Sequence, residues 1–306
     1  GRDDVKTCVI LNPMAGRGVA GQRREELELA LRAAGLDYEL VPTRSRGGGT
    51  ELAAQAVARG CDAVVAVGGD GTINEVVNGI HAGGGGAALG IIPLGTGSDF
   101  VKMLDGFDAG LPALARRLAA GTTRPVDLGK ITVATGGREL QRLFINGLGA
   151  GIDAQVAVEV GKVTWTTGLA AYMIASLRAL ASYTPSPMTV RYDGTELHKR
   201  LYFSTVANGR WQGGGFLLTP GAALDDGERE EADRRIVGRG VGGERARIAG
   251  RPLPHQLYRG PPVRHEPRLV PRGRPEDAGL ERLQGDQLLE ALAGAHEGGV
   301  SERALG

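Results

Sequence analysis

The stretch DAVVAVGGDGTINEVVNGI, residues 62–80, places one carboxylate inside a turn that contains three glycines. A helix N-terminus offers free N–H groups and a partial positive charge, both of which suit a phosphate. Gly68, Gly69 and Gly71 would let the backbone approach that phosphate closely. Asp70 would repel it unless a cation lies between them, and Mg²⁺ is the natural bridge. The turn therefore predicts a site for a nucleotide phosphate and its metal ion.

The spacing of Thr72 and Glu75 fits the capping box Thr-x-x-Glu, which predicts that a helix begins directly after the glycine turn. A simpler interpretation is an ordinary Asp-Gly turn that joins a strand to a helix and binds nothing. Further turns of the same kind at the same edge of the fold would favour the phosphate site over the ordinary turn.

Two further glycine turns occur, LNPMAGRG (11–18) and IIPLGTGSDF (91–100). Each follows an apolar run that predicts a strand. The aspartate of the second turn opens the next helix, where it could equally serve as an N-cap. Three such turns, two of them carrying aspartate, favour a composite site. These two turns contribute Asn12, Pro13, Gly16, Gly95, Thr96, Gly97 and Asp99.

The elements that must position these turns alternate along the first part of the chain. Apolar runs at 5–12, 37–43, 61–69 and 89–95 predict strands, and the segments 23–35, 50–60 and 72–80 have helical spacing. Strands that are apolar on both faces and alternate with helices predict a parallel sheet with helices on both faces. Ligands of such sheets bind beyond the carboxyl ends of the strands, where all three turns fall.

The pattern changes near residue 128. Segments 128–149 and 188–209 alternate apolar and polar residues around TGG and Asp-Gly turns, which is typical of hairpins. We predict an α/β domain over 1–128 and a mainly antiparallel, sandwich-like β domain over 129–227. One apolar helix at 168–183 belongs to the second domain, where it either packs as a core helix or contacts lipid.

The composition changes again near residue 228. From there to residue 306 the chain has 14 arginines, no lysine and one aromatic residue, Tyr258, and its prolines cluster. Such a composition buries little apolar surface and predicts an irregular, disordered segment. The abrupt change also resembles a GC-rich gene read in a shifted frame.

The overall composition excludes several classes of protein. The net charge of +1 gives no general attraction to nucleic acid. Cys8 and Cys61 both lie in apolar runs and are interpreted as core residues in a reducing compartment. No apolar run reaches 18 residues, so we expect a cytoplasmic protein without a transmembrane segment.

Beyond these local patterns, the chain resembles the diacylglycerol kinase catalytic-domain family of lipid kinases. The resemblance covers about residues 5–227, in order and at the expected spacing. The motif GGDG alone is weak evidence for this family, because NAD kinases and phosphofructokinases also carry it. The motifs are NPMAG (12–16), GGDGTINEVVNG (68–79), PLGTGSDF (93–100), RPVDLG (124–129), FINGLGAGIDA (144–154) and the segment from VANGRWQGGGF to ALDDG (206–227).

The resemblance implies an ATP- and Mg²⁺-dependent kinase that phosphorylates a lipid hydroxyl, diacylglycerol-like, at the membrane surface. It places ATP in the first domain and the lipid against the second, and a homodimer is compatible with it. Asp70, Asp99 and Asp127 match an acidic network that holds Mg²⁺, with Asp70 catalytic, and Asp225 and Asp226 match a second cation site. The implied nucleotide-contacting residues are Asn12, Pro13, Gly16, Thr43, Gly68, Gly69, Asp70, Gly71, Thr72, Asn74, Glu75, Gly95, Thr96 and Gly97.

One expected feature is missing. The resemblance implies an Asp-Gly-Glu segment near the end, whose glutamate would accept the proton of the lipid hydroxyl, and no such segment follows Gly227. YDGTEL (192–197), GGER (242–245) and QGDQ (284–287) do not match it. The alternatives are therefore a nucleotide-binding protein without catalysis, an inert damaged product and a NAD kinase, against which LDDG and GTGSDF argue.

Overall fold

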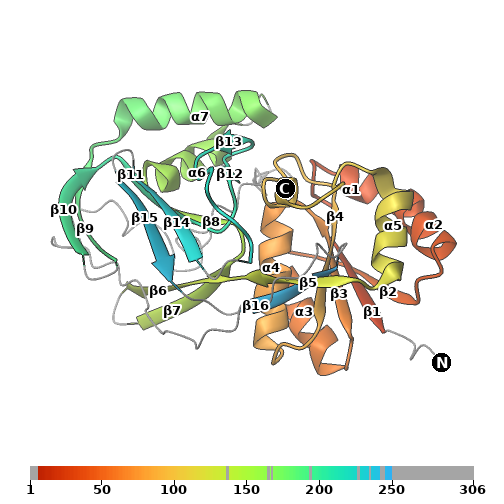
Figure 1. Cartoon of the computed structure of the whole chain (residues 1–306). Helices are drawn as coiled ribbons and strands as arrows, with labels where there is room; N and C mark the ends of the chain where they lie inside the picture. The colour runs from red at the N-terminus through yellow and green to blue at the C-terminus, as the bar shows by residue number, and fades with distance from the viewer. Residues whose placement is uncertain are drawn as a thin grey trace.

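The computed structural model describes residues 6–135, 138–163, 166, 168–192, 195–225, 228–233, 236–241 and 245–249. The chain folds into two domains that lie side by side, one built around a parallel sheet and the other made mainly of antiparallel strands (Figure 1). This confirms the predicted fold class.

The first domain alternates strands and helices as the apolar spacing predicts. Helix α2 covers most of the predicted segment 23–35, and α3 covers most of 50–60. Its elements are β1 (Thr7–Leu11), α1 (Val19–Gln22), α2 (Arg24–Ala33), β2 (Tyr38–Pro42), α3 (Gly48–Ala58), β3 (Ala63–Gly68), α4 (Asp70–Ala82), β4 (Ala88–Pro93), the 3-10 helix η1 (Phe100–Met103), α5 (Gly110–Ala120) and β5 (Thr123–Asp127).

Helices cover both faces of the first sheet, because its central strands are apolar on both sides. Cys8 and Ile10 of β1 face a core shared with α3 and α4. Val9 and Leu11 of the same strand face a second core shared with α2 and α5. Figure 1 shows these helix pairs on opposite sides of the strands. All four β1 side chains are almost fully buried, and this burial is the main stabilising contribution.

The register of the sheet brings the glycine turns to one edge. Strands β2, β1, β3 and β4 are neighbours in that order and run parallel. Leu11 pairs with Val67, and Gly68 pairs with Pro93, so β1, β3 and β4 end at the same level. The turns that follow them therefore lie together, as the sequence predicts for parallel strands.

The second domain contains the two predicted hairpins. Thr135 pairs with Arg138 across one, and Tyr192 pairs with Thr195 across the other. Its elements are β6 (Gly129–Thr135), β7 (Arg138–Phe144), β8 (Gly147–Gly151), α6 (Ile152–Lys162), α7 (Gly168–Ser182), β9 (Ser186–Tyr192), β10 (Thr195–Leu201), β11 (Phe203–Ala207), β12 (Trp211–Gln212), β13 (Phe216–Leu217), β14 (Glu228–Asp233) and β15 (Ile236–Val241).

Helix α6 is not predicted from the sequence, which indicates only one helix in this domain. Its residues are rich in β-branched side chains, which lower helix propensity. It forms because Val156 and Val160 pack with Ala175 and Ala179 of α7. Tertiary packing therefore overrides the local preference.

The structure also differs from the sequence pattern after Gly227, where we predict an irregular segment. Strands β14 and β15 extend the sheet of β8 and β11, and β16 (Arg245–Ala249) inserts between β4 and β5 of the first domain. These strands form by main-chain pairing to existing strand edges, which requires no apolar alternation in the added strand. The prediction for 250–306 lies outside the described residues.

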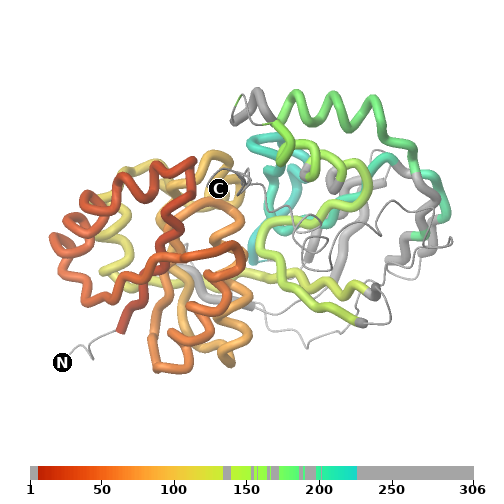
Figure 2. The backbone as a smooth tube through the Cα atoms, turned by 180° about the vertical axis from the view of Figure 1, so that it is seen from behind, coloured from red at the N-terminus to blue at the C-terminus, as the bar shows by residue number. Residues whose placement is uncertain are grey.

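The two domains meet next to the edge that carries the glycine turns. The loop after β4 and the β12–β13 hairpin face one another there (Figure 2). Asn78 of α4 also binds β7, since its side-chain amide donates to Leu143 O and accepts from Leu143 N, both at 2.9 Å. Polar contacts at two places therefore fix the second domain against the first.

Candidate active site

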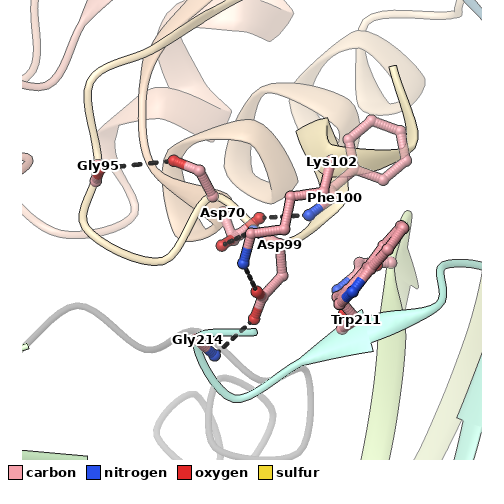
Figure 3. Close-up of polar contacts among 9 residues, drawn as sticks. Asp70, Gly95, Asp99, Phe100, Lys102, Trp211 and Gly214 are labelled. Carbon is pink, nitrogen blue, oxygen red and sulfur yellow. Dashed lines mark hydrogen bonds and ion pairs between the residues drawn. The ribbon is translucent and has the colours of Figure 1, made fainter. Parts of the chain in front are cut away.

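Asp70 connects the start of α4 to the loop that follows β4. Its Oδ2 accepts the main-chain N–H of Asp99 at 2.9 Å, and its Oδ1 accepts that of Phe100 at 3.0 Å (Figure 3). A Cβ atom on Gly97 would lie 3.3 Å from Asp70 Oδ2, so this loop passes close to the carboxylate. Two of the predicted turns thus meet at Asp70.

Burial raises the pKa of Asp70 above its ordinary value. The two main-chain N–H groups oppose this shift because they stabilise the ionised form, and Lys102 opposes it weakly. The neighbouring Asp99 adds to the raised pKa through repulsion between like charges. A bound cation would relieve both the burial penalty and the repulsion.

Asp99 is buried and links the two domains. Its Oδ1 accepts a hydrogen bond from the Lys102 ammonium at 2.6 Å, and its Oδ2 accepts one from the main-chain N–H of Gly214 at 2.7 Å (Figure 3). The alternative role as a helix N-cap is not observed, because η1 has no side-chain cap. The carboxylate instead points out of the first domain toward the β12–β13 hairpin.

The predicted capping box is wrong. Helix α4 begins at Asp70 with Gly69 at the N-cap position, three residues earlier than the box requires, and no described side chain caps it. Glu75 instead accepts the main-chain N–H groups of Gly47 and Gly49, each at 2.9 Å, at the start of α3. Thr72 Oγ1 accepts the side-chain amide of Asn12 at 3.0 Å. Both side chains therefore bind other elements rather than their own helix end.

The first glycine turn packs against the other two. Besides its bond to Thr72, Asn12 accepts the main-chain N–H of Met14 at 3.0 Å, which shapes the turn. Gly16 has a φ of +59°, and a Cβ there would lie 2.5 Å from Leu94 O. The turn after β1 thus touches the turn after β3 through Asn12 and the loop after β4 through Gly16.

The remaining predicted nucleotide-binding residues lie around this junction. Thr43 follows β2, and its main-chain N–H donates to Leu11 O at 2.8 Å. Gly69 and Gly71 flank Asp70 at the start of α4, one turn before Asn74. Thr96 is exposed between Gly95 and Gly97, and Pro13 is half-buried beside Asn12. The structure places all of them on or next to the three turns.

The predicted acidic network is only partly assembled. Asp70 and Asp99 are adjacent, whereas Asp127 is buried at the end of β5 and tied to the second domain. Its main-chain N–H donates to Leu224 O, and its carbonyl accepts Asn208 Nδ2, both at 2.7 Å. Strand β5 also runs opposite to β4, because it is antiparallel to β16 while β16 is parallel to β4. A part for Asp127 in a shared metal site stays a prediction.

The second predicted cation site is described in part. Asp225 is exposed, and Asp226 lies outside the described residues. Among the residues described, no three His, Cys, Asp or Glu side chains gather in a way that could hold a metal ion alone. The triplet Asp226-Gly227-Glu228 has the residue types expected around the missing base, but neither Asp226 nor the Glu228 side chain is described.

Sequence reasoning missed Lys102 and gave Gly214 no role. A lysine three residues after Asp99 on a predicted helix has the spacing of an ion pair, and this signal could have identified Lys102. The bond between Asp99 and Gly214 joins residues 115 positions apart, which no local spacing indicates. Asn208, which bridges Asp127 O and Ile145 O, is equally non-local.

Comparison with known proteins identifies related sequences for both domains. Residues 6–131 match the diacylglycerol kinase catalytic domain, and residues 146–230 match the YegS C-terminal NAD kinase beta sandwich-like domain. A diacylglycerol kinase of Mycobacterium tuberculosis is 32% identical over 228 residues, which are 72% of this chain and 71% of that protein. A diacylglycerol kinase of Bacillus subtilis is 30% identical over 220 residues, 72% and 70% of the two chains.

Solved structures agree with these sequence matches. The crystal structure of a diacylglycerol kinase from Bacillus anthracis superposes with a TM-score of 0.56 and 27% identity, over 74% of this chain and 72% of that chain. The similarity extends across both domains, since it covers more residues than the first domain contains.

Proposed function

Because the chain belongs to the diacylglycerol kinase family of lipid kinases, we propose that it transfers the γ-phosphoryl group of ATP to the hydroxyl of a diacylglycerol-like lipid. The observation that carries this proposal is the meeting of three glycine turns at one sheet edge around Asp70 and Asp99. In such a site, catalysis consists mostly of positioning the reactants and stabilising charge.

We assign the ATP phosphates to the turns around the start of α4. Main-chain N–H groups in the first turn of a helix have no partner within the helix and attract anions. Gly68 is required here, because a Cβ would lie 2.4 Å from Thr72 Oγ1 and displace the bond to Asn12. Thr43 and Thr96, on the neighbouring loops, would contact the rest of the nucleotide.

Asp70 and Asp99 fit a Mg²⁺ ion that arrives with ATP. Mg²⁺ prefers oxygen ligands, is bound through one or two carboxylates and keeps several waters. The two carboxylates are adjacent, and the burial that raises the pKa of Asp70 favours a cation beside it. When bound, the ion neutralises phosphate charge. Asp70 and Asp99 would hold and orient it.

The acceptor lies in a bilayer, so we also propose that the second domain associates peripherally with the membrane. Met173, Leu177 and Leu180 of α7 have 44%, 62% and 57% of their surface exposed. They recur at the spacing of one helix face. Phe216 of the β12–β13 hairpin continues this surface, since its ring lies 5.8 Å from that of Tyr172 on α7. No helix in the described part of the chain is long and apolar enough to cross a bilayer.

The proposed activity is tested by transfer of labelled γ-phosphate from ATP, with Mg²⁺, to lipids in mixed micelles. Diacylglycerol, phosphatidylglycerol, ceramide and sphingosine are offered separately, and label is counted in the organic phase. We expect label on diacylglycerol and a loss of about 10²-fold or more with Asp70→Asn. Asp37→Asn, an exposed residue between α2 and β2, is the matched control. ATP binding without organic-phase label would instead indicate a nucleotide-binding protein that lacks the base.

Membrane association is tested separately by co-sedimentation with phosphatidylglycerol vesicles. Leu177→Glu should reduce the bound fraction, because a charge on the exposed α7 face opposes insertion into the bilayer interface. Leu29→Glu is the matched control, because Leu29 lies on α2 of the first domain and is 65% exposed, about as much as Leu177. This variant should bind the vesicles as the parent does. Equal loss in both variants would contradict a specific α7 surface.

A further inference from the structure

Lys102 occupies a place between the two domains that the proposed function does not use. It lies on η1 with its side chain 25% exposed, and its ammonium is 2.6 Å from Asp99 Oδ1. A Cβ on Gly215 would lie 3.4 Å from Lys102 Nζ, so the lysine also borders the glycine loop of the β12–β13 hairpin. Figure 3 shows Lys102, Asp99 and Gly214 together, with Trp211 of the hairpin pointing toward η1.

The loop of the β12–β13 hairpin has a backbone conformation that glycine adopts more easily than any other residue. Gly213, Gly214 and Gly215 have φ values of +64°, +85° and +125°, which are unfavourable for residues with a Cβ. This conformation presents the Gly214 N–H to Asp99 Oδ2 at 2.7 Å. A Cβ on Gly213 would lie 2.5 Å from the Tyr172 hydroxyl on α7. The loop is therefore held between η1 of one domain and α7 of the other.

The Asp99 carboxylate uses one oxygen for each domain. Oδ1 is fixed by Lys102 from its own helix, which leaves Oδ2 directed at the hairpin. A charge-assisted hydrogen bond is shorter and stronger than a neutral one, and the 2.6 Å pair has that geometry. Because Asp99 is buried, loss of the ammonium would leave its charge poorly compensated and its side chain free to turn.

We propose that Lys102 is a positioning residue: it orients Asp99 so that the glycine hairpin of the second domain stays docked on the first domain beside Asp70. The hairpin joins the nucleotide loops to α7, so docking would set the acceptor domain against the phosphate. The catalytic part of this inference rests on the proposed kinase activity, whereas the docking of the hairpin does not.

Trp211 provides a direct measurement of docking. The chain contains two tryptophans, Trp165 and Trp211, so Trp165→Phe leaves one indole, which lies on the hairpin. In this background Lys102→Met should shift the emission of Trp211 to longer wavelength and increase its quenching by acrylamide. Lys102→Arg, which keeps the charge and the donors, should restore both signals toward the parent values.

Lys162→Met is the matched control. Lys162 pairs with Glu159 three residues earlier, also at 2.6 Å, but on α6. Its removal should leave the Trp211 signals unchanged. In the Asp99→Asn background, Lys102→Met should have no additional effect on Trp211, because the lysine acts through Asp99.

Kinetics separate positioning from general stability. Lys102→Met should lower kcat on the order of 10-fold or more, since small misplacement of a site residue is costly, and should change the KM for ATP much less. If that variant does not fold, Lys102→Gln, which keeps a donor without the charge, is measured in the same way. Unchanged Trp211 emission and quenching in a folded variant would overturn the proposal. If the parent transfers no phosphate, the proposed function fails while the fluorescence result still decides docking.

Discussion

The carboxylate of Glu75, on α4, caps the start of α3 by accepting the main-chain N–H of Gly49 at 2.9 Å. The same carboxylate accepts the N–H of Gly47 at 2.9 Å. Two donors that α3 leaves without intrahelical partners are thus satisfied by a neighbouring helix. This contact holds the segment after Thr43 against the helix that begins at Asp70.

Glu75→Ala should therefore destabilise the first domain. Both main-chain donors lose a charged acceptor, and we expect a loss of about 1–3 kcal/mol in the free energy of unfolding. Urea denaturation measures it. Glu51→Ala is the control, because Glu51 is exposed in the first turn of α3 and its carboxylate accepts a hydrogen bond from the side-chain amide of Gln55. A loss no larger than that of Glu51→Ala would show that the Glu75 contact contributes nothing.

Replacement by alanine should have opposite effects on stability at Gly68 and at Gly161. A Cβ on Gly68 would lie 2.4 Å from Thr72 Oγ1 in a buried turn, whereas no atom of the described residues outside the helix backbone lies within 4 Å of a Cβ on Gly161 in α6. Gly68→Ala should lower the free energy of unfolding by about 1–3 kcal/mol. Gly161→Ala should raise it by about 0.5–1 kcal/mol, because alanine reduces the entropy of the unfolded helix segment.

Thermal unfolding of the two variants, followed by circular dichroism, tests this pair. The kinase assay adds a second criterion, since Gly68→Ala should also weaken ATP binding through the displaced Thr72 and Asn12. A stabilised Gly68→Ala protein would mean that the turn after β3 has more room than the described contacts allow.

Much of the first domain could be predicted from local spacing. The runs at 5–12 and 61–69 contain unbroken apolar stretches at 8–11 and 63–67, and these stretches lie in β1 and β3, which are buried on both faces. Parallel strands end at one edge, so the meeting of Asp70 with the loop of Gly97 and Asp99 also follows from the order of elements.

The rest depends on contacts between distant segments. The Thr72 and Glu75 spacing matches a capping box, yet the glutamate accepts two main-chain N–H groups at the start of α3, 26 and 28 positions away. Helix α6 depends on packing with α7. Strand β16 depends on the edges of β4 and β5. Local sequence carries no information about which edge or helix end will be close.

Because of the Cys8 thiol, the stability of the protein should depend on pH in the alkaline range. Burial raises the pKa of the Cys8 thiol from its ordinary 9.0 to about 11, and the nearby Cys61 adds to the shift. As pH rises from 9 to 11, the unfolded thiol ionises first while the folded one stays protonated. The free energy of unfolding should fall over this interval by up to about 2–3 kcal/mol from this group.

Denaturation at pH 8, 9, 10 and 11 checks the size and sign of this effect. Cys8→Ala should be less stable at pH 8, because it leaves a small cavity, but should lose less stability as pH rises. Cys61→Ala keeps the Cys8 thiol but removes the smaller contribution of Cys61 to its raised pKa, so its loss of stability with pH should fall between those of the parent and Cys8→Ala. Parallel curves for the parent and Cys8→Ala would contradict the raised pKa.

Ser98 has a φ of +50°, a conformation that is uncommon for residues other than glycine and asparagine. This turn of the backbone directs the next two N–H groups, of Asp99 and Phe100, to the two oxygens of Asp70. Ser98→Asn should therefore keep or increase stability. Ser98→Val should lower the free energy of unfolding by about 1–3 kcal/mol, because a β-branched residue is strained at positive φ.

Ser98→Val should also lower kcat, because relaxation of the backbone withdraws the N–H groups that hold Asp70 beside Asp99. Ser98→Ala is the matched control: it removes the weak bond from Ser98 Oγ to Gly95 O, 3.4 Å long, without adding a branch at Cβ. Urea denaturation and the labelled-phosphate assay are measured on all three variants. If Ser98→Val is as stable and as active as Ser98→Ala, the positive φ at this position does not hold the Asp70 and Asp99 arrangement.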